Sequence, residues 1–469
     1  MFQSRRRFSN RRSFARRSRR QRVPWIRVGI ALVAAAIGLE LAARAFLGVL
    51  GAGGSPSVNG PGGIPAAAYQ LQFQTQDGRP IAGLTEGGNP IARRDPQLGY
   101  RLAGDQQSPF WQIGERGFRN AEPVPPAKPE DEIRVFILGG SAAFGQWADG
   151  NSATIAPKLE QQLNERVARQ QNSPGEYRPD VLPFYKPTRR EALSRPPKIR
   201  EGNYRVINAA VPGHASSNQL ARLALQVLSY QPDAIVAIDG YRDLLLPGDR
   251  QAADIPQLDA LLADAGRHLR AQWGNPLQRW LQQTALVRVL GAWFSPSGTT
   301  SLSVTEATLA RGGRADASLT ERLPTQQAER QRRATRYRRH YQAMAQAIAG
   351  TDIPLVSVLQ PEITGRSSAH RAPQEQATID ELGEAYVQRL RQGYARLGAA
   401  NQQLEAAFDG VTALNLYQLY QDSPDRAFYD PIHLTERANA ALAERLYQAL
   451  AGLEAMQIVP ENAELPEGE

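Results

Sequence analysis

Short apolar runs alternate with amphipathic stretches through the middle of the chain. Five runs of aliphatic and β-branched residues occupy 135–138, 204–208, 234–238, 355–359 and 411–416. Two of the stretches between and after them have a helical period, which places one set of apolar side chains on each helix face: Leu220, Leu223, Ala224, Val227 and Leu228 in 217–229, and Ala438, Leu442, Leu446 and Leu450 in 435–450. Alternating strands and helices build a parallel sheet that is covered on both faces. The pattern therefore predicts a three-layer α/β/α domain with a five-stranded parallel sheet.

Two stretches interrupt this alternation within the domain, which we place at 131–452. Residues 171–203 are rich in proline and arginine, and residues 249–335 are partly helical and then polar. We interpret both as insertions over the core, where they would be the main source of substrate specificity.

A long apolar run precedes the domain. Residues 28–50 would form about 34 Å of helix, enough for a hydrocarbon core of about 30 Å. Glu40 and Arg44 interrupt the run, but they lie four residues apart with the acid first, which is the favourable helical pairing. We predict a single-pass transmembrane helix at 23–50. The alternative is a cleaved export signal, since "SRRRF" and "NRRSF" look like twin-arginine motifs.

The charge of the chain is concentrated before this helix. Residues 1–22 hold ten arginines and no acid, so the net charge of +9 leaves −1 for the rest of the chain. A basic flank stays on the cytoplasmic side, which predicts a cytoplasmic tail and an extracytoplasmic catalytic domain. This placement favours the membrane over nucleic acid as the partner of the tail. The absence of cysteine excludes thiol catalysis and disulfides.

Three further segments carry little periodicity. Residues 51–68 are rich in glycine, proline and alanine, which predicts a flexible linker. Residues 69–130 hold short strand-like runs and turns, and we interpret them as a small lead-in or cap segment. Residues 453–469 are acidic and broken by prolines, so we expect a loose tail.

The first strand of the domain runs directly into the stretch "GGSAAFG", which presents Ser141 on a glycine turn. Its spacing is not that of a phosphate loop or of a dinucleotide-binding turn. It also differs from the nucleophile elbow of α/β-hydrolases, because Ala143 occupies the last glycine position. A serine at this place can alternatively be the N-cap of a helix.

Three later segments place polar and charged residues at the ends of other strands: "NAAVPG" at 208–213, "DGYRD" at 239–243 and "DPIH" at 430–433. A serine nucleophile needs a base, and the base needs a carboxylate that holds its tautomer. Asp430 and His433 lie one turn apart, so the carboxylate can bind one ring nitrogen while the other faces Ser141. The alternative for both residues is a solvated loop before a helix that Thr435 caps.

Taken in order, these four segments resemble the motifs of the SGNH (GDSL-like) hydrolase family, in its Gly-Gly-Ser variant, over about residues 131–450. The lead-in "LGYR…ERGFR" with an N-terminal anchor is similar to the membrane-tethered bacterial members. The resemblance implies a flavodoxin-like SGNH hydrolase fold with Ser141, His433 and Asp430 as catalytic residues. It also implies an oxyanion hole formed by the backbone N–H groups of Ser141 and Gly213 and by an asparagine side chain.

This chain departs from the family at the asparagine position, where it has Arg242. An arginine can donate hydrogen bonds to an oxyanion, whereas losing one such donor lowers the rate about 10²- to 10³-fold. Alternatively, Arg242 forms a structural salt bridge with Asp239 or Asp243.

The sequence thus predicts a membrane-anchored serine esterase that cleaves an O-acyl ester of an envelope glycan or lipid. An O-acyltransferase with the same triad and a catalytically inactive binding module are the alternatives. No cofactor is expected, and no metal, because no histidine or acidic cluster has metal-ligand spacing. We expect His214 at the rim of the pocket, and His268, His340 and His370 at the surface.

Overall fold

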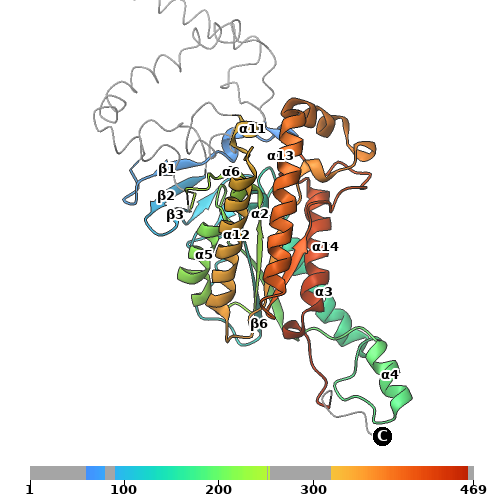
Figure 1. The fold of residues 1–469 in the computed structure, drawn as a ribbon. Coiled ribbons are helices and arrows are strands. Elements are labelled where there is room, and N and C mark those ends of the chain that lie inside the picture. Colours follow the sequence, from blue (N-terminus) through green and yellow to red (C-terminus); the bar gives the residue numbers. More distant parts are fainter. Residues whose placement is uncertain (1–59, 80–89, 251, 254–317, 463–469) are drawn as a thin grey trace, which may run out of the picture. The chain divides into compact units, whose positions relative to one another are not determined.

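The computed structural model describes residues 60–79, 90–250, 252–253 and 318–462 (Figure 1). These residues belong to one of the two compact units of the chain. The predicted basic tail, the predicted membrane helix at 23–50 and most of the predicted insertion at 249–335 lie outside the described residues. Within the described ranges, no helix is long and apolar enough to cross a membrane.

A five-stranded sheet of strand order β10-β9-β8-β6-β7 forms the centre of the domain, and every neighbouring pair is parallel. Its strands are β6 (Glu132–Gly139), β7 (Asn203–Asn208), β8 (Ala234–Asp239), β9 (Leu355–Leu359) and β10 (Val411–Asn415). Both faces are covered, so β6, β8 and β9 are buried along their whole length. The five predicted strands are confirmed.

Helices cover the sheet on both faces. The long helices are α3 (Ile155–Asn172), α5 (Ser216–Leu225), α12 (Gln327–Ile348), α13 (Pro373–Glu405) and α14 (Glu436–Gly452). Right-handed crossovers put α3 on one face, because β7 lies to one side of β6, and put α5, α12 and α13 on the other face, because the chain then returns toward β10. Helix α14 packs against α3, and α12 packs against α5 and α13. The predicted three layers are confirmed.

Short helices fill the connections of the domain. They are α2 (Ser141–Phe144), α4 (Lys186–Ser194), α6 (Tyr241–Leu245), α11 (Leu319–Arg322), and the 3-10 turns η1 (Pro61–Gly63), η2 (Ala66–Ala68), η3 (Pro174–Glu176), η4 (Val227–Tyr230), η5 (Ile363–Gly365), η6 (Ser368–His370) and η7 (Glu454–Met456).

The two amphipathic faces that the sequence predicts differ in outcome. In α14 all four apolar residues are buried, as expected, and Thr435 caps the helix by accepting a hydrogen bond from the N–H of Ala438. In α5 and η4, Leu223 and Val227 are buried but Ala224 is exposed. Gln219 and Arg222 take buried positions on α5 instead, because their polar groups bind partners inside the domain.

The lead-in segment is built into the main core. It forms a three-stranded sheet and a two-stranded one from β1 (Gln72–Gln74), β2 (Ile91–Asp95), β3 (Gly99–Leu102), β4 (Gln106–Gln107) and β5 (Gln112–Ile113). Tyr69, Tyr100 and Trp111 are buried in the same apolar cluster as the central strands. The predicted linker also ends earlier than residue 68, because Ile64 and Ala68 are buried in this cluster.

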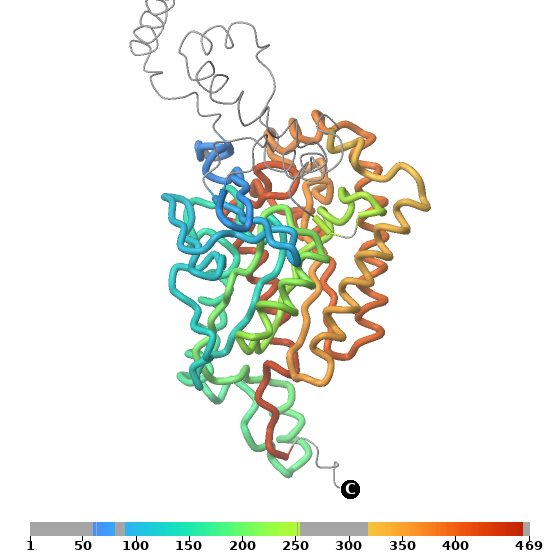
Figure 2. The backbone as a smooth tube through the Cα atoms, turned by 90° about the vertical axis from the view of Figure 1, so that its left-hand side faces the viewer, coloured from blue at the N-terminus to red at the C-terminus, as the bar shows by residue number. Residues whose placement is uncertain are grey.

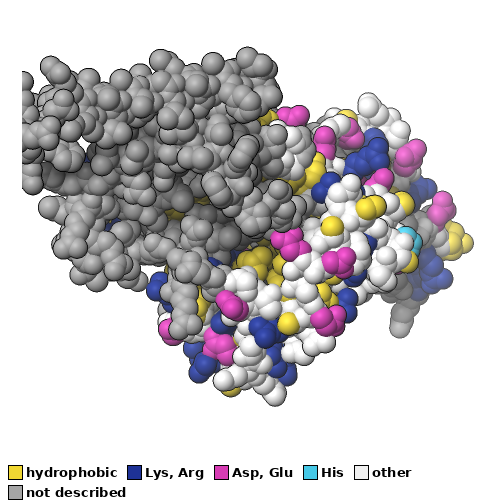
Figure 3. Space-filling model, turned by 90° about the horizontal axis from the view of Figure 1, so that it is seen from above, with side chains coloured by type: hydrophobic (Ala, Val, Ile, Leu, Met, Phe, Trp, Pro, Cys, Tyr) yellow, Lys and Arg dark blue, Asp and Glu magenta, His cyan; other side chains and the backbone are white. Residues whose placement is uncertain are grey.

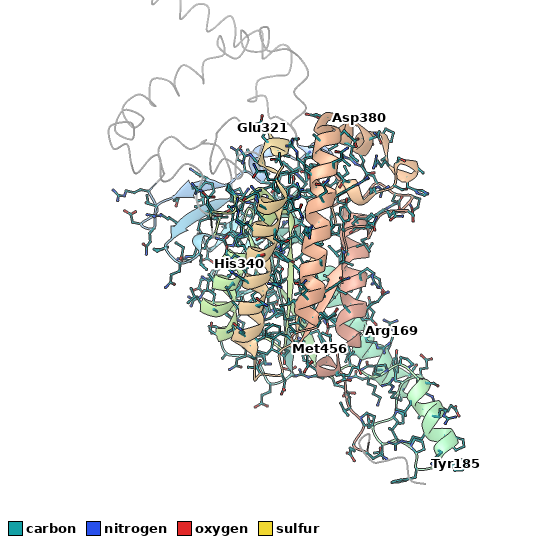
Figure 4. The ribbon with its side chains drawn as sticks, in the orientation of Figure 1. Arg169, Tyr185, Glu321, His340, Asp380 and Met456 are labelled. Carbon is teal, nitrogen blue, oxygen red and sulfur yellow. The ribbon has the colours of Figure 1, made fainter. Side chains whose placement is uncertain are left out.

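Residues 173–200 form an arm at the amino-terminal edge of the sheet, where α3 ends and β7 begins. Figure 4 shows Tyr185 near the end of the arm, with Glu321 and Asp380 at the opposite end of the domain. Ser141 follows the carboxyl end of β6, so this insertion does not lie over the predicted site. The expectation that residues 171–203 lie over the site is therefore wrong.

The C-terminal segment packs along this arm, as Figure 2 shows at the lower end of the domain. Ile199 pairs with Gln457 in an antiparallel bridge. The Asn462 side chain accepts a hydrogen bond from the N–H of Leu182 and donates one to its carbonyl. The prediction of a loose tail is therefore wrong for residues 453–462, and residues 463–469 lie outside the described ranges.

Candidate active site

Ser141 is the first residue of α2, directly after the central strand β6. Gly140 is the N-cap of this short helix, so the alternative that Ser141 is an N-cap is wrong. Gly139 is required by close packing, because a Cβ atom there would lie 2.3 Å from the Cβ of Ala143 and 2.7 Å from the carbonyl oxygen of Ile238. The tight turn holds Ser141 at the carboxyl edge of the sheet, with 2% of its surface exposed.

The turn lies where the strand order reverses. The chain leaves β6 toward β7 on one side, whereas it leaves β8 toward β9 on the other. Such a reversal opens a crevice between the two strands at their carboxyl ends, which is where open α/β sheets bind ligands. Ser141 follows β6 and Arg242 follows β8, so both side chains lie at this crevice.

A small cavity occupies the crevice. Its volume of about 10 Å³ is about the room that one water molecule needs. Its walls are Gly140, Ser141, Gly213, His214, Asp239, Tyr241, Arg242, Gln360 and Ile432. The structure thus brings Ser141, Gly213 and Arg242 to one cavity, and Ile432 is the neighbour of His433.

Asp430 and His433 form a buried pair, so the alternative of a solvated loop is wrong. Their side chains are 3% and 0% exposed. Nδ1 of His433 lies 2.5 Å from Oδ2 of Asp430, while Oδ1 accepts the backbone N–H groups of Ile432 and His433. Burial raises the pKa of Asp430, but the charge of His433 and these hydrogen bonds outweigh it, so the pKa falls below its ordinary value of 3.8. The carboxylate stays ionised and fixes the orientation of the ring.

Trp147 gives Asp430 a further partner that the sequence analysis missed. Its indole N–H donates to Oδ2 of Asp430 at 3.0 Å, and the residue has a left-handed backbone with φ of 68°. This conformation is costly for a bulky residue and is kept where the surrounding structure requires it. The signal in the sequence was weak: Trp147 lies six residues after Ser141, and a buried indole needs an acceptor.

The loop that carries Gly213 is held by the lead-in segment. The Tyr100 hydroxyl donates to the carbonyl of Pro212, and the Tyr100 carbonyl lies 2.9 Å from Nε2 of His214. Burial, and then the charge of Arg222, lower the pKa of His214 to about 3, so its ring is neutral and donates to that carbonyl. His214 lines the cavity, as expected. Gly213 itself has φ of 81°, a conformation that favours glycine.

Arg242 is 8% exposed, which rules out a solvated surface position for it. The two carboxylates considered as its partners each also bind another described residue. Oδ2 of Asp239 accepts from Gln219, and the carboxylate of Asp243 accepts both the N–H and the hydroxyl of Ser216. Burial and the neighbouring Asp243 raise the pKa of Asp239 well above its ordinary value, which favours the neutral form of its carboxyl group.

A second serine, histidine and aspartate meet beside α6. Oγ of Ser216 lies 2.6 Å from Oδ1 of Asp243 and 2.8 Å from Nδ1 of His340, a residue of α12 that Figure 4 labels. The expectation that His340 lies at the surface is wrong, because its ring is half-buried against these groups. His370 is exposed, as expected, and His268 lies outside the described residues.

Arg119 of the lead-in is another residue that the sequence analysis missed. It is 2% exposed, and its guanidinium donates to the carbonyls of Phe144 and Gly145, at the end of the helix that Ser141 begins. Asn208 also donates to the carbonyls of Ala143 and Phe144. The helix C-terminus is thereby fixed from two sides, which holds Ser141 in place.

No protein-family model matches the sequence, and no curated protein is similar to it. Several solved structures are similar to the chain. A lipase/acylhydrolase from Enterococcus faecalis is 13% identical at a TM-score of 0.32, over 68% of this chain and 96% of that one. The acetyl xylan esterase AlAXEase is 12% identical at a TM-score of 0.32, over 68% and 99%. A GDSL-like lipase from Bacteroides thetaiotaomicron is 11% identical at a TM-score of 0.29, over 70% and 91%.

At these identities and TM-scores the likenesses carry no weight for the reaction or the substrate. The chain is similar to lipases and esterases, one of which is a GDSL-like lipase.

Proposed function

We propose that the protein is a serine esterase that hydrolyses an O-acyl ester of an envelope glycan or lipid. The observation that carries this proposal is the buried pair of Asp430 and His433, together with a glycine turn that holds Ser141 in the crevice at the carboxyl edge of the sheet. Asp430 accepts four hydrogen bonds, which is the arrangement that a carboxylate needs in order to orient a catalytic imidazole.

The proposed reaction has two halves. Oγ of Ser141 attacks the ester carbonyl while its proton passes to Nε2 of His433, and His433 returns that proton to the departing alcohol. Water then attacks the acyl-enzyme with His433 as the base, which releases the acid and restores the serine. The negative charge on the carbonyl oxygen would be stabilised by backbone N–H groups of Ser141 and Gly213 and by the Arg242 guanidinium.

The size of the cavity favours a small acyl group. A volume of about 10 Å³ among the described residues means that the walls must move apart for any acyl group, and much less for an acetyl group than for a long chain. The alcohol part of the ester must bind outside this cavity. Acetyl esters of sugar hydroxyls fit both conditions.

Covalent labelling tests the proposal. A fluorophosphonate probe should label the purified wild-type protein at Ser141, and Ser141→Ala should not be labelled. Absence of an adduct on folded wild-type protein would overturn the esterase proposal and favour an inactive binding module. Release of acetate from acetylated glycans, compared with the Ser141→Ala protein, then identifies the substrate.

We further propose that the domain is anchored to a membrane with its active site outside the cytoplasm. This rests on the ten arginines of residues 1–22 and the apolar run that follows them. A topology reporter fused after residue 68 should be active only outside the cytoplasm. Activity of the same fusion inside the cytoplasm would contradict the proposed orientation.

A further inference from the structure

A second, much larger cavity, which we call the outer cavity, lies at the same edge of the sheet as Ser141. Its volume of about 450 Å³ is within the range of small-ligand sites, which is about 300 to 1,000 Å³. Three separate segments form its walls: Thr364, Gly365, Arg366 and Ser367 after β9, Arg391, Tyr394 and Ala395 on α13, and Asn415, Tyr417, Gln418 and Gln421 at and after the end of β10.

The wall of this outer cavity is fixed from inside the domain. The Glu362 carboxylate is fully buried and accepts the backbone N–H of Thr364 at 2.7 Å and its hydroxyl at 2.5 Å. The Thr364 hydroxyl in turn lies 2.8 Å from the Tyr417 hydroxyl. A Cβ atom at Gly365 would lie 2.2 Å from the carbonyl oxygen of Tyr417, so only glycine fits there. A wall held this way needs little ordering when a ligand binds.

The groups that line the outer cavity suit a sugar. Asn415, Gln418 and Gln421 each carry an amide with both donors and an acceptor, which matches hydroxyl groups that donate and accept. The buried ring of Tyr394 lies beside the half-buried ring of Tyr417 with centroids 4.7 Å apart. Tyr417 therefore offers the aromatic surface against which the apolar face of a sugar ring can pack. The Tyr394 hydroxyl is buried and has no hydrogen-bond partner among the described residues.

The charge at the outer cavity is positive. Arg366 is buried and paired with Glu375 at 3.1 Å, which neutralises it. The exposed Arg391 donates to the carbonyl of Thr364 at 3.3 Å and forms no ion pair within the described part of the chain. No acidic residue lines the cavity, although the buried Glu362 lies behind its wall. Burial, and then the charge of Arg391, lower the pKa of Arg371, so a second cation lies nearby. A carboxylate is the group that such an unneutralised guanidinium binds best.

A buried chain of hydrogen bonds runs between the walls of the outer cavity and of the cavity at Ser141. The Tyr386 hydroxyl lies 3.0 Å from Oε1 of Glu362 and 3.1 Å from the hydroxyl of Tyr241, which lines the smaller cavity. Strands β9 and β6 are separated by β8 alone, so the ends of these two strands lie roughly 10 Å apart along the sheet edge. A glycan that lies along this edge would reach both.

We propose that the outer cavity binds an acidic sugar residue of a glycan, with the sugar carboxylate on Arg391. This inference rests on the proposed function and adds to it: the small cavity would take the acyl group, and the outer cavity would hold a neighbouring acidic unit of the same chain. The substrate would then be a glycan that contains uronic acids, not a lipid.

Calorimetric titration of the full chain, carrying Ser141→Ala, with tetragalacturonate and with maltotetraose tests the site. Tetragalacturonate should bind with a Kd of about 1 mM or tighter, and maltotetraose at least about tenfold more weakly. Arg391→Ala should weaken tetragalacturonate binding about 10- to 100-fold, the usual effect of losing a charged hydrogen bond. Gln418→Ala, which removes an exposed amide, is a second variant and should weaken tetragalacturonate binding less than Arg391→Ala does.

A matched control is Arg445→Ala on α14, since Arg445 is an exposed helical arginine whose guanidinium donates to a neighbouring glutamine. It should leave binding unchanged. Equal binding of the two saccharides, or equal tetragalacturonate affinity before and after Arg391→Ala, would overturn the proposed site. If the saccharide binds as expected but wild-type protein is not labelled by the fluorophosphonate, the site stands and the esterase function fails.

Discussion

Two sets of serine, histidine and aspartate lie at the carboxyl edge of the sheet, and the aspartate binds a different member of each set. In the first, Asp430 binds the histidine His433, and Ser141 lines a cavity. In the second, Asp243 binds the serine directly, through both the hydroxyl and the N–H of Ser216, and His340 contacts that same hydroxyl.

The order of connection decides the chemistry that each set can perform. A serine hydroxyl has one proton, which Ser216 donates to Asp243, so Nδ1 of His340 must donate to Ser216 and cannot take a proton from it. Ser216 is also fully buried at the start of α5, where no ester can reach it. The second set thus ties α5, α6 and α12 together, whereas the proposed function assigns nucleophilic catalysis to the first.

The largest expected difference in turnover is that between the two single variants in which each serine is replaced by alanine. Ser141→Ala should lower turnover of an acetyl ester on the order of 10⁴-fold or more, because the nucleophile is lost. Ser216→Ala should keep turnover within about tenfold of wild type but lower the free energy of unfolding by about 1 to 3 kcal/mol, since Asp243 loses a buried partner. Equal loss of turnover in both proteins at equal melting temperature would contradict the assignment.

The two aspartates extend the same test. Asp430→Asn should lower turnover about 10⁴-fold with little effect on folding, because an amide oxygen at this place favours the wrong tautomer of His433. Asp243→Asn should mainly change stability. Ester hydrolysis and thermal melting of both variants separate these effects, and full turnover by Asp430→Asn would show that His433 is not the base.

Arg242 has a smaller expected effect. If its guanidinium takes the place of the asparagine in the SGNH motif that the sequence resembles, Arg242→Ala should lower turnover about 10²-fold with little change in KM, since an oxyanion donor acts on the transition state. Arg242→Asn should recover part of the loss. The background rate is that of Ser141→Ala, and an Arg242→Ala protein as fast as wild type would remove Arg242 from the oxyanion hole.

Local patterns were enough to predict the central sheet and the triad candidates. The strands at β6, β8 and β9 are continuous apolar runs, because both faces of a parallel sheet are covered. The "DPIH" segment brings its carboxylate and imidazole together within one turn of chain. Such features depend on near neighbours in the sequence, so a sequence alone shows them.

Contacts between distant parts of the chain could not be predicted in this way. Trp147 reaches Asp430 across 283 residues, and Ser216 reaches His340 across 124. The predicted loose tail gains order from its pairing with the arm, which no local pattern shows. On the described part of the upper face, acidic and basic side chains are interspersed (Figure 3). Such a surface has no run of like charge in the sequence that would have pointed to a binding site.

The smallest expected effect is on the pH dependence of stability, and it distinguishes the roles of His340 and His433. Burial lowers the pKa of His340 below its ordinary value of 6.5; the charge of Asp243 opposes this shift and that of Arg336 adds to it. The folded protein therefore holds His340 neutral, while the unfolded chain takes up a proton as the pH falls below about 6.5. This group stabilises the fold above that pH and less so below it.

His340→Asn should therefore reduce the fall in stability between pH 7 and about pH 5, by less than the limit of about 1.4 kcal/mol per pH unit for a single proton. Contributions from His214 and Asp430 are common to both proteins and cancel in the difference between their melting curves. His370→Asn is the matched control, because His370 is exposed and should leave the curve unchanged. The pH profile of turnover should be the same in wild type and His340→Asn, since the proposed base is His433. A shifted turnover profile with an unshifted stability curve would reverse the roles assigned to the two histidines.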